Sequence, residues 1–419
     1  MNIIVYGTGY VGLSLCKVLS NKHNVIGIDV NSDKVSLLNA CYFNNDNLRF
    51  TGRINKNEFV NADIIFITVG TPSNEDGSTN LEYVFNVADD IIKCYNLYER
   101  DKELVIIIKS TVPCGTTVKF NNYIREKIDK YNKFRVLFNP EFLREGNEIY
   151  DLMHPDRVVI GCGYYNDNKE KELFIDLFEY NNNIHFVITD YNTAEMIKYA
   201  ANSFLALKIS FINEISELCS KIGADIIKVA EGIGYDNRIG NKFLNSGLGW
   251  GGSCFPKDCH SLLYEGNKVG CNMEILKSNI NTNDRCVDRA VEILENEISG
   301  KTFAIFGIAF KEGTDDIRDS VSLKLCDRLL NNGYKLKIND PMALGNAKRY
   351  YSGNNRVEIC NNIEECVKDV DCIIIATEWK CYKHLNYECL GDLMRDRNIF
   401  DGRNLLYNRV PKGFKYLHL

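Results

Sequence analysis

The segment Asn2–Asp29, NIIVYGTGYVGLSLCKVLSNKHNVIGID, decides how the beginning of this chain folds. The apolar run Asn2–Tyr6 has the composition of a buried strand, and Gly7–Gly12 fits the pattern GxGxxG. Apolar residues then recur at helical spacing, and a second apolar run, Val25–Ile28, ends at Asp29. Strand, glycine turn, helix, strand and acid in this order predict a dinucleotide-binding βαβ unit.

Each part of this fingerprint has a physical role. Gly7 permits the tight turn, Gly9 lets the backbone approach a pyrophosphate, and Gly12 lets the helix pack closely on the strand. N–H groups at the helix start attract phosphate. Asp29 can accept a hydrogen bond from a ribose 2′-hydroxyl and would repel a 2′-phosphate, so we expect NAD and not NADP. Lys34 either contacts the adenosine end or is a solvated lysine.

Length and composition describe a globular protein of two or three domains. The chain has 419 residues, of which 45% are hydrophobic and 25% charged, and its net charge is −6. Without a basic run, nucleic acid and anionic membranes are not expected partners. No apolar run approaches the roughly 18 residues that span a bilayer, and the N-terminus reads as a strand, not a signal peptide.

The 16 cysteines show no CxxC spacing. We therefore expect reduced thiols in a cytoplasmic protein. A metal site at Cys254, Cys259 and His260 is not expected, because paired ligand spacing is absent.

Further parallel strands are predicted by three apolar runs, Asp63–Val69, Leu104–Lys109 and Val136–Phe138. They lead into the loops Gly70–Ser73, Ser110–Pro113 and Asn139–Gly146. Loops after strand ends bind ligands in doubly wound sheets. If the last loop is helical, Glu141 and Glu145 are i,i+4 neighbours suited to general-base and cofactor-positioning roles. The alternative is a solvated first helical turn. Strand–helix alternation ends near Val187–Thr189.

A long amphipathic helix is predicted from Thr193 to about Cys219. Its core-facing positions are Ile197, Ala201, Phe204, the stem of Lys208, Phe211, Ile215 and Leu218. Lys198 and Asn202 lie one turn apart on a neighbouring face, where they could stabilise a developing alkoxide or form a snorkelling surface pair. With further helices at Ala224–Glu231 and Met273–Glu295, we expect a helical domain that is also a dimer surface.

The loop Gly247–His260, GLGWGGSCFPKDCH, has the composition of a nucleophile site. Its glycines allow close approach to a ligand. Cys254 follows them, and Lys257 could favour the thiolate while Asp258 holds a water or a proton. A glycine-rich turn before one more buried cysteine is the alternative.

A second α/β unit begins at Lys301, with a strand at Thr302–Phe306. The run Val370–Thr377 parallels Ala62–Thr68, but the glycine fingerprint is missing, so no second dinucleotide is expected. Lys311 and Arg318 at one strand end, and Arg403 after another, could hold phosphates or a ribose; surface salt bridges are the alternative.

The expected fold is α/β, with two Rossmann-like doubly wound parallel-sheet domains joined by a long central helix and a small helical dimerisation domain. The expected domains are residues 1–191 for NAD, 192–298 for the central helical part with the Cys254 loop, and 299–419 for the nucleotide sugar.

Eight motifs in one order cover nearly the whole chain: GTGYVG, VGTPS, KSTVP, NPEFLREG, the Lys198–Asn202 helix, GWGGSCFPKD, GIAFKEGTDDIRDS and FDGR. In these motifs the sequence resembles the UDP-glucose/GDP-mannose dehydrogenase family. The resemblance implies a four-electron oxidation of a nucleotide sugar, from primary alcohol to carboxylate, with two NAD consumed in turn. UDP-glucose, giving UDP-glucuronate, is the expected substrate, and GDP-mannose or a UDP-N-acetylhexosamine is the alternative.

The resemblance also implies roles for single residues. Cys254 is the nucleophile that forms a thiohemiacetal and a thioester, Lys198 with Asn202 stabilises the oxyanion, and Asp258 orders water or a proton. Thr111 and Glu141 belong to the proton and water network. The implied NAD contacts are Gly7, Gly9, Val11, Gly12, Asp29, Lys34, Thr71, Thr111, Glu145, Lys257 and Arg318.

The implied contacts to the sugar nucleotide are Glu141, Phe142, Leu143, Arg144, Glu145, Lys198, Asn202, Arg238, Phe243, Leu244, Asn245, Ser246, Gly247, Gly251, Lys311 and Arg403. Arg238 is expected to reach into a neighbouring subunit, so a homodimer or a higher homo-oligomer is expected. Trp250 stands where the family more often has Phe or Tyr. An aromatic ring is kept, so little change is expected, but the difference leaves room for altered sugar selectivity.

Two other classes remain alternatives. A two-electron 3-hydroxyacid-type dehydrogenase has the first domain, a long helix and a lysine on it, but needs neither Cys254 nor a second α/β domain. A non-catalytic NAD-binding protein has no reason to combine Cys254, Lys198 and Asp258.

Overall fold

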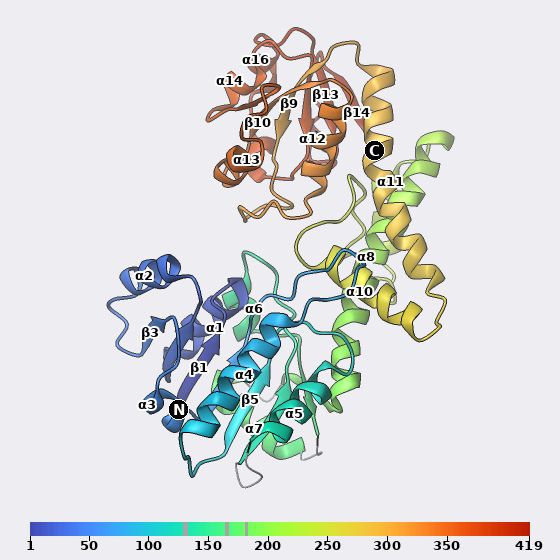
Figure 1. The fold of residues 1–419 in the computed structure, drawn as a ribbon. Coiled ribbons are helices and arrows are strands. Elements are labelled where there is room, and N and C mark those ends of the chain that lie inside the picture. The colour runs from blue at the N-terminus through green and yellow to red at the C-terminus, as the bar shows by residue number, and fades with distance from the viewer. Residues whose placement is uncertain (129–132, 164–166, 181–182) are drawn as a thin grey trace. The chain divides into compact units, whose positions relative to one another are not determined.

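The computed structural model describes residues 1–128, 133–163, 167–180 and 183–419. The chain divides into two compact units, Met1–Ala201 and Asn202–Leu419. Figure 1 colours the first unit from blue to green and the second from green to red. Among the described residues, no helix is long and apolar enough to cross a membrane.

The first unit contains a sheet of eight strands among its described residues, in the order β3-β2-β1-β4-β5-β6-β7-β8. Neighbouring strands are parallel except β6 and β7, which pair antiparallel through Leu137–Cys162 and Phe138–Gly161. The strands are β1 (Asn2–Tyr6), β2 (Asn24–Ile28), β3 (Leu48–Thr51), β4 (Ile64–Ile67), β5 (Leu104–Ile108), β6 (Phe134–Phe138), β7 (Arg157–Cys162) and β8 (His185–Thr189).

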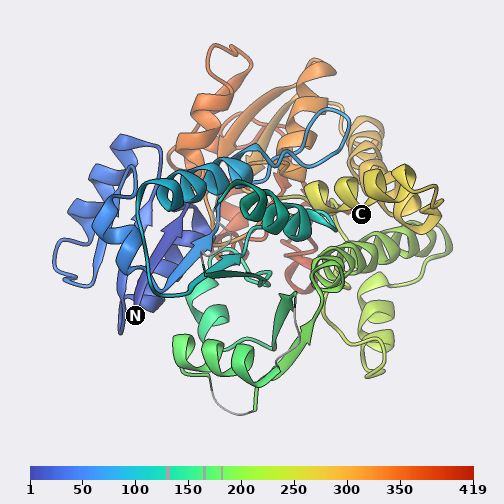
Figure 2. The same cartoon turned by 60° about the horizontal axis from the view of Figure 1, so that its bottom comes forward.

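Helices cover both faces of this sheet. They are α1 (Tyr10–Leu19), α2 (Ser32–Cys41), α3 (Lys56–Asn61), α4 (Glu82–Leu97), α5 (Thr116–Lys127), α6 (Glu148–Met153) and α7 (Asp167–Phe178). Ile4 of β1 packs into a core with α4 and α5 (cyan and teal in Figure 2), whereas Ile3 packs into a second core with α1 and α7. Strands buried on both faces read as continuous apolar runs, which is why the sequence predicts them well.

The second unit contains a six-stranded parallel sheet in its described part, in the order β11-β10-β9-β12-β13-β14. Its strands are β9 (Thr302–Phe306), β10 (Lys335–Asn339), β11 (Val357–Ile359), β12 (Cys372–Ile375), β13 (Asn398–Asp401) and β14 (Lys415–His418). The helices in this part are α12 (Val321–Asn331), α13 (Leu344–Tyr350), α14 (Ile363–Val367), α15 (Lys380–Lys383) and α16 (Tyr387–Gly391).

Four helices connect the two sheets along the chain: α8 (Tyr191–Ile222), α9 (Ile226–Gly234), α10 (Phe255–Lys268) and α11 (Glu274–Glu297). The first, α8, begins in the first unit and continues in the second. The expected fold of two parallel-sheet α/β units with a long central helix is confirmed. The domain limits at residues 191 and 298 stay predictions.

The predicted core face of α8 is wrong at three positions, whereas Ile197 and Ile215 are half-buried and pack against core clusters. Phe204, Phe211 and Leu218 are 62%, 50% and 53% exposed. Polar side chains are buried on this helix instead, among them Glu195 and Lys198. Hydrophobic periodicity predicts that this segment is a helix. It does not predict that polar side chains such as Glu195 and Lys198 have hydrogen-bond partners inside the protein.

Candidate active site

The glycine turn after β1 has the geometry that the fingerprint requires. Gly7 has φ +86° and donates its N–H to the Ile28 carbonyl at 2.8 Å. A Cβ on Gly12 would lie 1.9 Å from the Gly7 carbonyl oxygen, so only glycine lets α1 pack this closely. No atom lies within 4 Å of the position of a Cβ on Gly9. The backbone at Gly9 therefore faces open space at the start of α1, beside the half-buried Val11.

Asp29, at the end of β2, is held ionised by its neighbours. Its carboxylate accepts hydrogen bonds from the Thr8 hydroxyl at 2.6 Å, the Asn31 N–H at 3.1 Å and the Lys34 ammonium at 2.8 Å. Burial favours the neutral acid, but these partners outweigh it and lower the pKa of Asp29 to about 2. Lys34 is thus an ion-pair partner of the predicted ribose ligand, and not a free solvated lysine.

The loops after β4 and β5 are joined by hydrogen bonds. The buried Thr71 donates its hydroxyl to the Thr111 carbonyl at 2.9 Å, and Ser110 donates to the Val69 carbonyl at 2.7 Å. Both loops follow the carboxyl ends of parallel strands, so Thr71 and Thr111 share the edge at which such sheets bind ligands.

A buried group of charged side chains lies beyond β5 and β6. The Lys198 ammonium is 3.1 Å from Oε1 of Glu141, and Oε2 accepts the Leu143 N–H at 2.6 Å. Burial would raise the pKa of Glu141, but Lys198 and the hydrogen bonds hold it below its ordinary value. Lys109 donates to the Asn139 side chain at 2.7 Å, and burial lowers its pKa to about 8 although Glu141 opposes the change.

The segment after β6 is not helical. Residues 139–146 form a loop, and α6 begins at Glu148, so the helical i,i+4 geometry considered for Glu141 and Glu145 is absent. The Phe142 ring lies between two cations, with the Lys198 ammonium 5.2 Å and the Arg157 guanidinium 3.6 Å from its centroid. Arg144 instead pairs with Asp151, and its side chain is 64% exposed.

Asp258 is the most enclosed acid of the second unit's expected site, with 1% of the residue exposed. Its Oδ2 accepts a hydrogen bond from the Asn202 amide at 2.6 Å, and its Oδ1 accepts one from the Lys257 ammonium. Lys257, expected among the NAD contacts, is therefore an ion-pair partner of Asp258. Both carboxylate oxygens have a donor, which makes burial of the charge tolerable.

Cys254 is exposed and stands at the N-cap position of α10. Its carbonyl accepts the Asp258 N–H at 2.9 Å, and its thiol is 3.7 Å from the Ser253 hydroxyl. The positive end of a helix stabilises a thiolate. The alternative of one more buried cysteine is excluded by this exposure.

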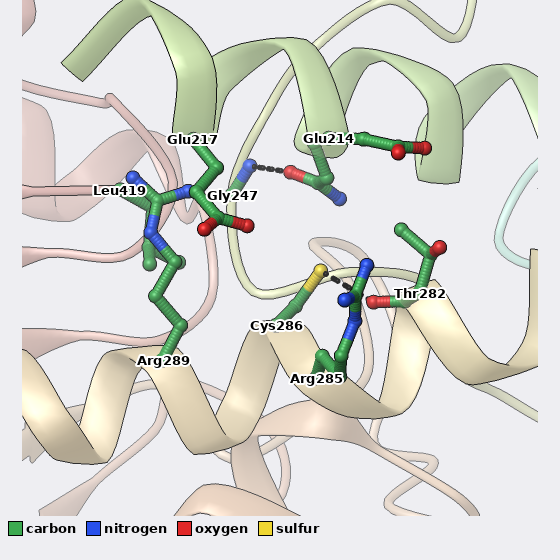
Figure 3. A pocket seen from close by; sticks show the side chains of 9 residues that line it. Glu214, Glu217, Gly247, Thr282, Arg285, Cys286, Arg289 and Leu419 are labelled. Atoms are coloured by element: carbon green, nitrogen blue, oxygen red, sulfur yellow. Dashed lines mark hydrogen bonds between the residues drawn. The ribbon is translucent and has the colours of Figure 1, made fainter. Parts of the chain in front are cut away.

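The segment before Cys254 is held by backbone contacts within the second unit. Gly247 donates its N–H to Asn213 of α8 at 2.7 Å, and a Cβ there would lie 2.5 Å from the Gly402 carbonyl. Gly251 is equally confined, since its Cβ would lie 2.3 Å from the Asp319 carbonyl. Figure 3 shows the pocket beside Gly247, where Glu217 of α8 lies near Arg289 of α11.

Arg403 lies against this glycine loop. Its guanidinium donates to the Gly249 carbonyl at 3.2 Å and the Ala376 carbonyl at 2.9 Å, and it pairs with Glu378. Asn404 donates to the Ser246 carbonyl at 3.1 Å. The end of β13 and the loop before Cys254, which are far apart in sequence, are therefore neighbours.

Trp250 is 4% exposed and supports the loop from inside. Its indole N–H donates to the Ser210 hydroxyl at 2.9 Å, and its backbone exchanges hydrogen bonds with Asn283. This position packs against α8, α10 and α11. Trp250 thus fills the core behind the loop.

The other expected ligands of the second unit differ in their surroundings. Leu244 and Ser246 are buried, whereas Phe243 and Asn245 are exposed. Arg318 makes a two-pronged pair with the buried Asp316. Lys311 lies over the Phe310 ring at 5.4 Å. Arg238 follows α9, pairs with Asp236, and has an 89% exposed side chain.

Family models match the chain in three consecutive parts. They are the NAD-binding domain of the UDP-glucose/GDP-mannose dehydrogenase family at residues 1–182, its central domain at 192–285 and its UDP-binding domain at 304–408. The chain belongs to the UDP-glucose/GDP-mannose dehydrogenase family. The NAD-binding match agrees with the glycine turn and Asp29 described above.

Relatives resemble this UDP-glucose/GDP-mannose dehydrogenase over its whole length. A UDP-glucose 6-dehydrogenase of Rickettsia conorii is 40% identical, with 99% of this chain and 98% of the relative covered. UDP-glucose 6-dehydrogenase YwqF of Bacillus subtilis is 42% identical, with 99% and 97% covered. A UDP-glucose dehydrogenase structure from Pyrobaculum islandicum superposes with a TM-score of 0.88 at 33% identity, covering 99% of this chain and 96% of that one.

Two buried charged residues of this family member were missed by the sequence analysis. Lys109 ends the run that predicted β5, and Glu195 lies one helical turn before Lys198. Hydropathy gives no signal for either, because a lone charge in an apolar run reads as solvent-exposed. Their nearness to Thr111 and Lys198 in sequence was the available hint.

Proposed function

We propose that this chain is an NAD-dependent dehydrogenase that oxidises UDP-glucose to UDP-glucuronate through a thioester on Cys254. Full-length similarity to UDP-glucose 6-dehydrogenases supports the substrate. The match to the family's UDP-binding domain supports a UDP-sugar in the second α/β part. The Cys254 chemistry is the finer part of the proposal and rests on the site.

The observation that carries this chemistry is the pairing of an exposed thiol with a buried acid one turn along α10. Cys254 occupies the N-cap position of α10, and Asp258 is fixed by Asn202 and Lys257. Oxidation of an alcohol to an aldehyde needs no nucleophile. Oxidation of the aldehyde to an acid does, because a hydride can leave only from a tetrahedral carbon.

The residues of the first unit fit NAD. Gly9 leaves open space beside the turn, and the start of α1 offers N–H groups to a pyrophosphate. Asp29 is an ionised acceptor for a ribose hydroxyl. Bound NAD supplies the hydride acceptor for both oxidations, one molecule for each. Thr71 and Thr111 position the loops at the same sheet edge.

The first oxidation removes a hydride from the primary alcohol carbon and a proton from its hydroxyl, leaving an aldehyde. Lys198 stabilises the oxygen as it gains negative charge, and Asn202 lies one turn further along α8. Glu141 orients Lys198 through their ion pair. A hydrogen-bonded ammonium at this position lowers the barrier because the charge is already in place.

The Cys254 sulfur then bonds to the aldehyde carbon, and the thiol proton passes to the oxygen to give a thiohemiacetal. The second oxidation removes a hydride and the hydroxyl proton and leaves a thioester. Water attacks the thioester, releasing the carboxylate and the Cys254 thiol. Asp258 and Glu141 are the carboxylates proposed to order this water and take its proton.

The nucleotide part of the substrate is assigned to the loop before Cys254 and to the strand-end arginine and lysine. Ser246, Gly247 and Gly251 belong to a rigid loop whose neighbour is Arg403. Lys311, after β9, adds a second cation. Two cations suit a diphosphate.

The deciding experiment is the yield of NADH per UDP-glucose with enzyme and NAD in excess, run to completion. Two NADH for each sugar, with UDP-glucuronate as product, is the expected result. One NADH would contradict the thioester mechanism. No turnover would contradict UDP-glucose as substrate, and GDP-mannose and UDP-N-acetylhexosamines would then be assayed in the same way.

We also propose that the protein is a homodimer, with α8 in the interface. Four of the exposed apolar residues on this helix recur at spacings of seven, seven and four: Phe204, Phe211, Leu218 and Ile222. Such a stripe on a soluble enzyme favours a second copy of the same chain as its cover. Light scattering of Phe211→Glu should give monomers where the unmodified chain gives dimers; a monomeric unmodified chain contradicts the proposal.

The proposed domains are residues 1–191, 192–298 and 299–419, and the proposed location is the cytoplasm. All 16 cysteines are free thiols in the structure, which suits a reducing compartment. Limited proteolysis with cuts near residues 191 and 298 would support the domain limits.

A further inference from the structure

Glu195 is a fully buried carboxylate that the proposed chemistry does not use. The residue is 0% exposed. Its Oε2 accepts the Gly115 N–H at 2.6 Å, and its Oε1 accepts both the Thr117 N–H at 2.8 Å and the Thr117 hydroxyl at 2.6 Å. Three donors from one short segment converge on a side chain that is 78 to 80 residues away in sequence.

These donors belong to the start of α5, which lacks a local cap. The N-cap residue is Gly115, at φ +87°, and it has no side chain to accept the first helical N–H groups. The first N–H groups of any helix need partners from elsewhere. Glu195 supplies them from α8, and its negative charge also suits the positive end of α5.

The segment fixed in this way carries Thr111. Its beginning is tied to the loop after β4 by the Ser110–Val69 and Thr71–Thr111 hydrogen bonds. Its end, at Gly115, is tied to Glu195. The loop between β5 and α5 is therefore held at both ends.

The anchor on α8 is adjacent to the proposed oxyanion residue. Glu195 and Lys198 are i,i+3 neighbours on one face of the helix, and both are buried. Lys198 in turn forms an ion pair with Glu141, in the loop after β6. Within the first unit, one face of α8 thus fixes two of the loops that follow the sheet.

We propose that Glu195 is a positioning residue, which holds the Thr111 loop in register with Lys198 during both oxidations. This inference rests on the proposed function, in which Thr111 and Lys198 act on the substrate. A cap that served stability alone would not need to lie one turn from the lysine. A displacement of about 1 Å at a reacting group can cost about 100-fold in rate.

The hydrogen bonds between Glu195 and the start of α5 depend on pH. Burial raises the pKa of Glu195 to about 7 even though Thr117 and Gly115 donate to the carboxylate, and Asp190, before α8, adds to the rise. Protonation turns one oxygen into a hydroxyl that no longer accepts from the N–H groups. The loop should therefore be held best above pH 7 and loosen as the pH falls below it.

The experiment compares Glu195→Gln with two other variants. Thr117→Val removes one of the three donors and keeps the side-chain shape. Glu82→Gln, in the exposed first turn of α4, is the matched control. Hydrogen exchange of the amides from Gly115 to Thr117 is measured without substrate, and kcat, the KM values for NAD and UDP-glucose, and the pH profile of kcat are measured with it.

For Glu195→Gln we expect faster exchange at these amides, a fall in kcat of about 10- to 100-fold, and loss of the wild-type decline in kcat below pH 7. Thr117→Val should speed amide exchange and lower kcat as well, but by less than Glu195→Gln does. Glu82→Gln should match wild type. Unchanged exchange, or faster exchange with a wild-type kcat and pH profile, would overturn the proposal. Because exchange needs no turnover, an inactive wild-type enzyme would contradict the proposed function while exchange still decides whether Glu195 holds the loop.

Discussion

The Lys198 ammonium lies 3.1 Å from the Glu141 carboxylate, with side chains that are 4% and 11% exposed. Helix α8 supplies the cation and the loop after β6 supplies the anion. Each of these buried charges compensates the other, so removal of either leaves the remaining charge less well compensated. The pair is also asymmetric, because Lys109 adds a second buried cation beside the single carboxylate.

Replacement of Lys198 by Met should act on both catalysis and Glu141. The oxyanion loses its ammonium, which predicts a fall in kcat of about 100- to 1000-fold. Glu141 loses the neighbour that lowers its pKa most, so the pKa of Glu141 should rise. Stopped-flow and pH profiles of turnover test both effects. Lys208→Met, on the same helix, should leave both unchanged; a similar loss there would show general damage to α8.

Lys109→Met should change how stability depends on pH. The pKa of Lys109 is about 8 in the folded chain, against an ordinary 10.5. Between these values the unfolded chain binds more protons, so the free energy of unfolding rises with pH across this window. Urea unfolding at several pH values should show that rise in wild type and a smaller one in Lys109→Met. Lys102→Met, with a 70% exposed side chain, is the control; identical slopes in all three would contradict the prediction.

Much of the fold follows from the sequence, because its strands are buried on both faces. The predicted bounds of β1 and β9 are those of the structure, and the glycine turn and Asp29 lie where the fingerprint places them. No strand was predicted at β7, which runs antiparallel to β6. Strand direction depends on the path of the connecting chain, and local composition does not record it.

The sequence predicts those site residues that belong to a recognisable motif. It does not predict those whose role depends on hydrogen-bond partners elsewhere in the chain. GWGGSCFPKD and the Lys198–Asn202 spacing point to Cys254, Asp258 and Lys198. Glu195 is recognisable only when α5 is known to lack a cap of its own. The same holds for α8, whose apolar stripe was assigned to the core although three of its residues are exposed and Glu195 and Lys198 are buried. Hydrogen-bond partners distant in sequence decide these cases.

Gly12→Ala should abolish NAD binding and weaken the first unit. The new methyl group would lie 1.9 Å from the Gly7 carbonyl and 2.4 Å from the Thr68 hydroxyl. Overpacking of this kind costs about 1–3 kcal/mol and pushes α1 away from the phosphate-binding turn. Urea unfolding and calorimetric titration with NAD test the two effects. Gly345→Ala has no atom within 4 Å of its Cβ and should bind NAD normally.

Cys254→Ser should separate the two oxidations. The alcohol can still be oxidised, but a serine hydroxyl is a much weaker nucleophile toward the aldehyde. We expect no UDP-glucuronate and a yield of at most one NADH per UDP-glucose, with the aldehyde trapped by a hydrazine. Cys271→Ser, at another exposed cysteine, should keep a yield of two. Normal acid formation by Cys254→Ser would contradict the thioester mechanism.

Arg238 tests whether the active site is completed by a second subunit. Its side chain is 89% exposed and pairs with Asp236 of the same turn, with 2.6 Å between the guanidinium and the carboxylate. If it acts in the neighbouring subunit, Arg238→Ala and Cys254→Ser chains should complement each other. Hybrid dimers then contain one site with both residues intact, so an equal mixture should recover about one quarter of wild-type activity.

Each variant alone should be strongly impaired, and recovery should require exchange of subunits by mild denaturation and refolding. The control mixes Lys198→Met with Cys254→Ser. If both residues serve their own subunit, each site of the hybrid lacks one of them and neither subunit has an intact site. In that case the mixture stays inactive. Recovery with Arg238→Ala but not with Lys198→Met would place Arg238 alone in the partner's site. Absence of recovery in both mixtures would contradict a role of Arg238 in the partner subunit's site.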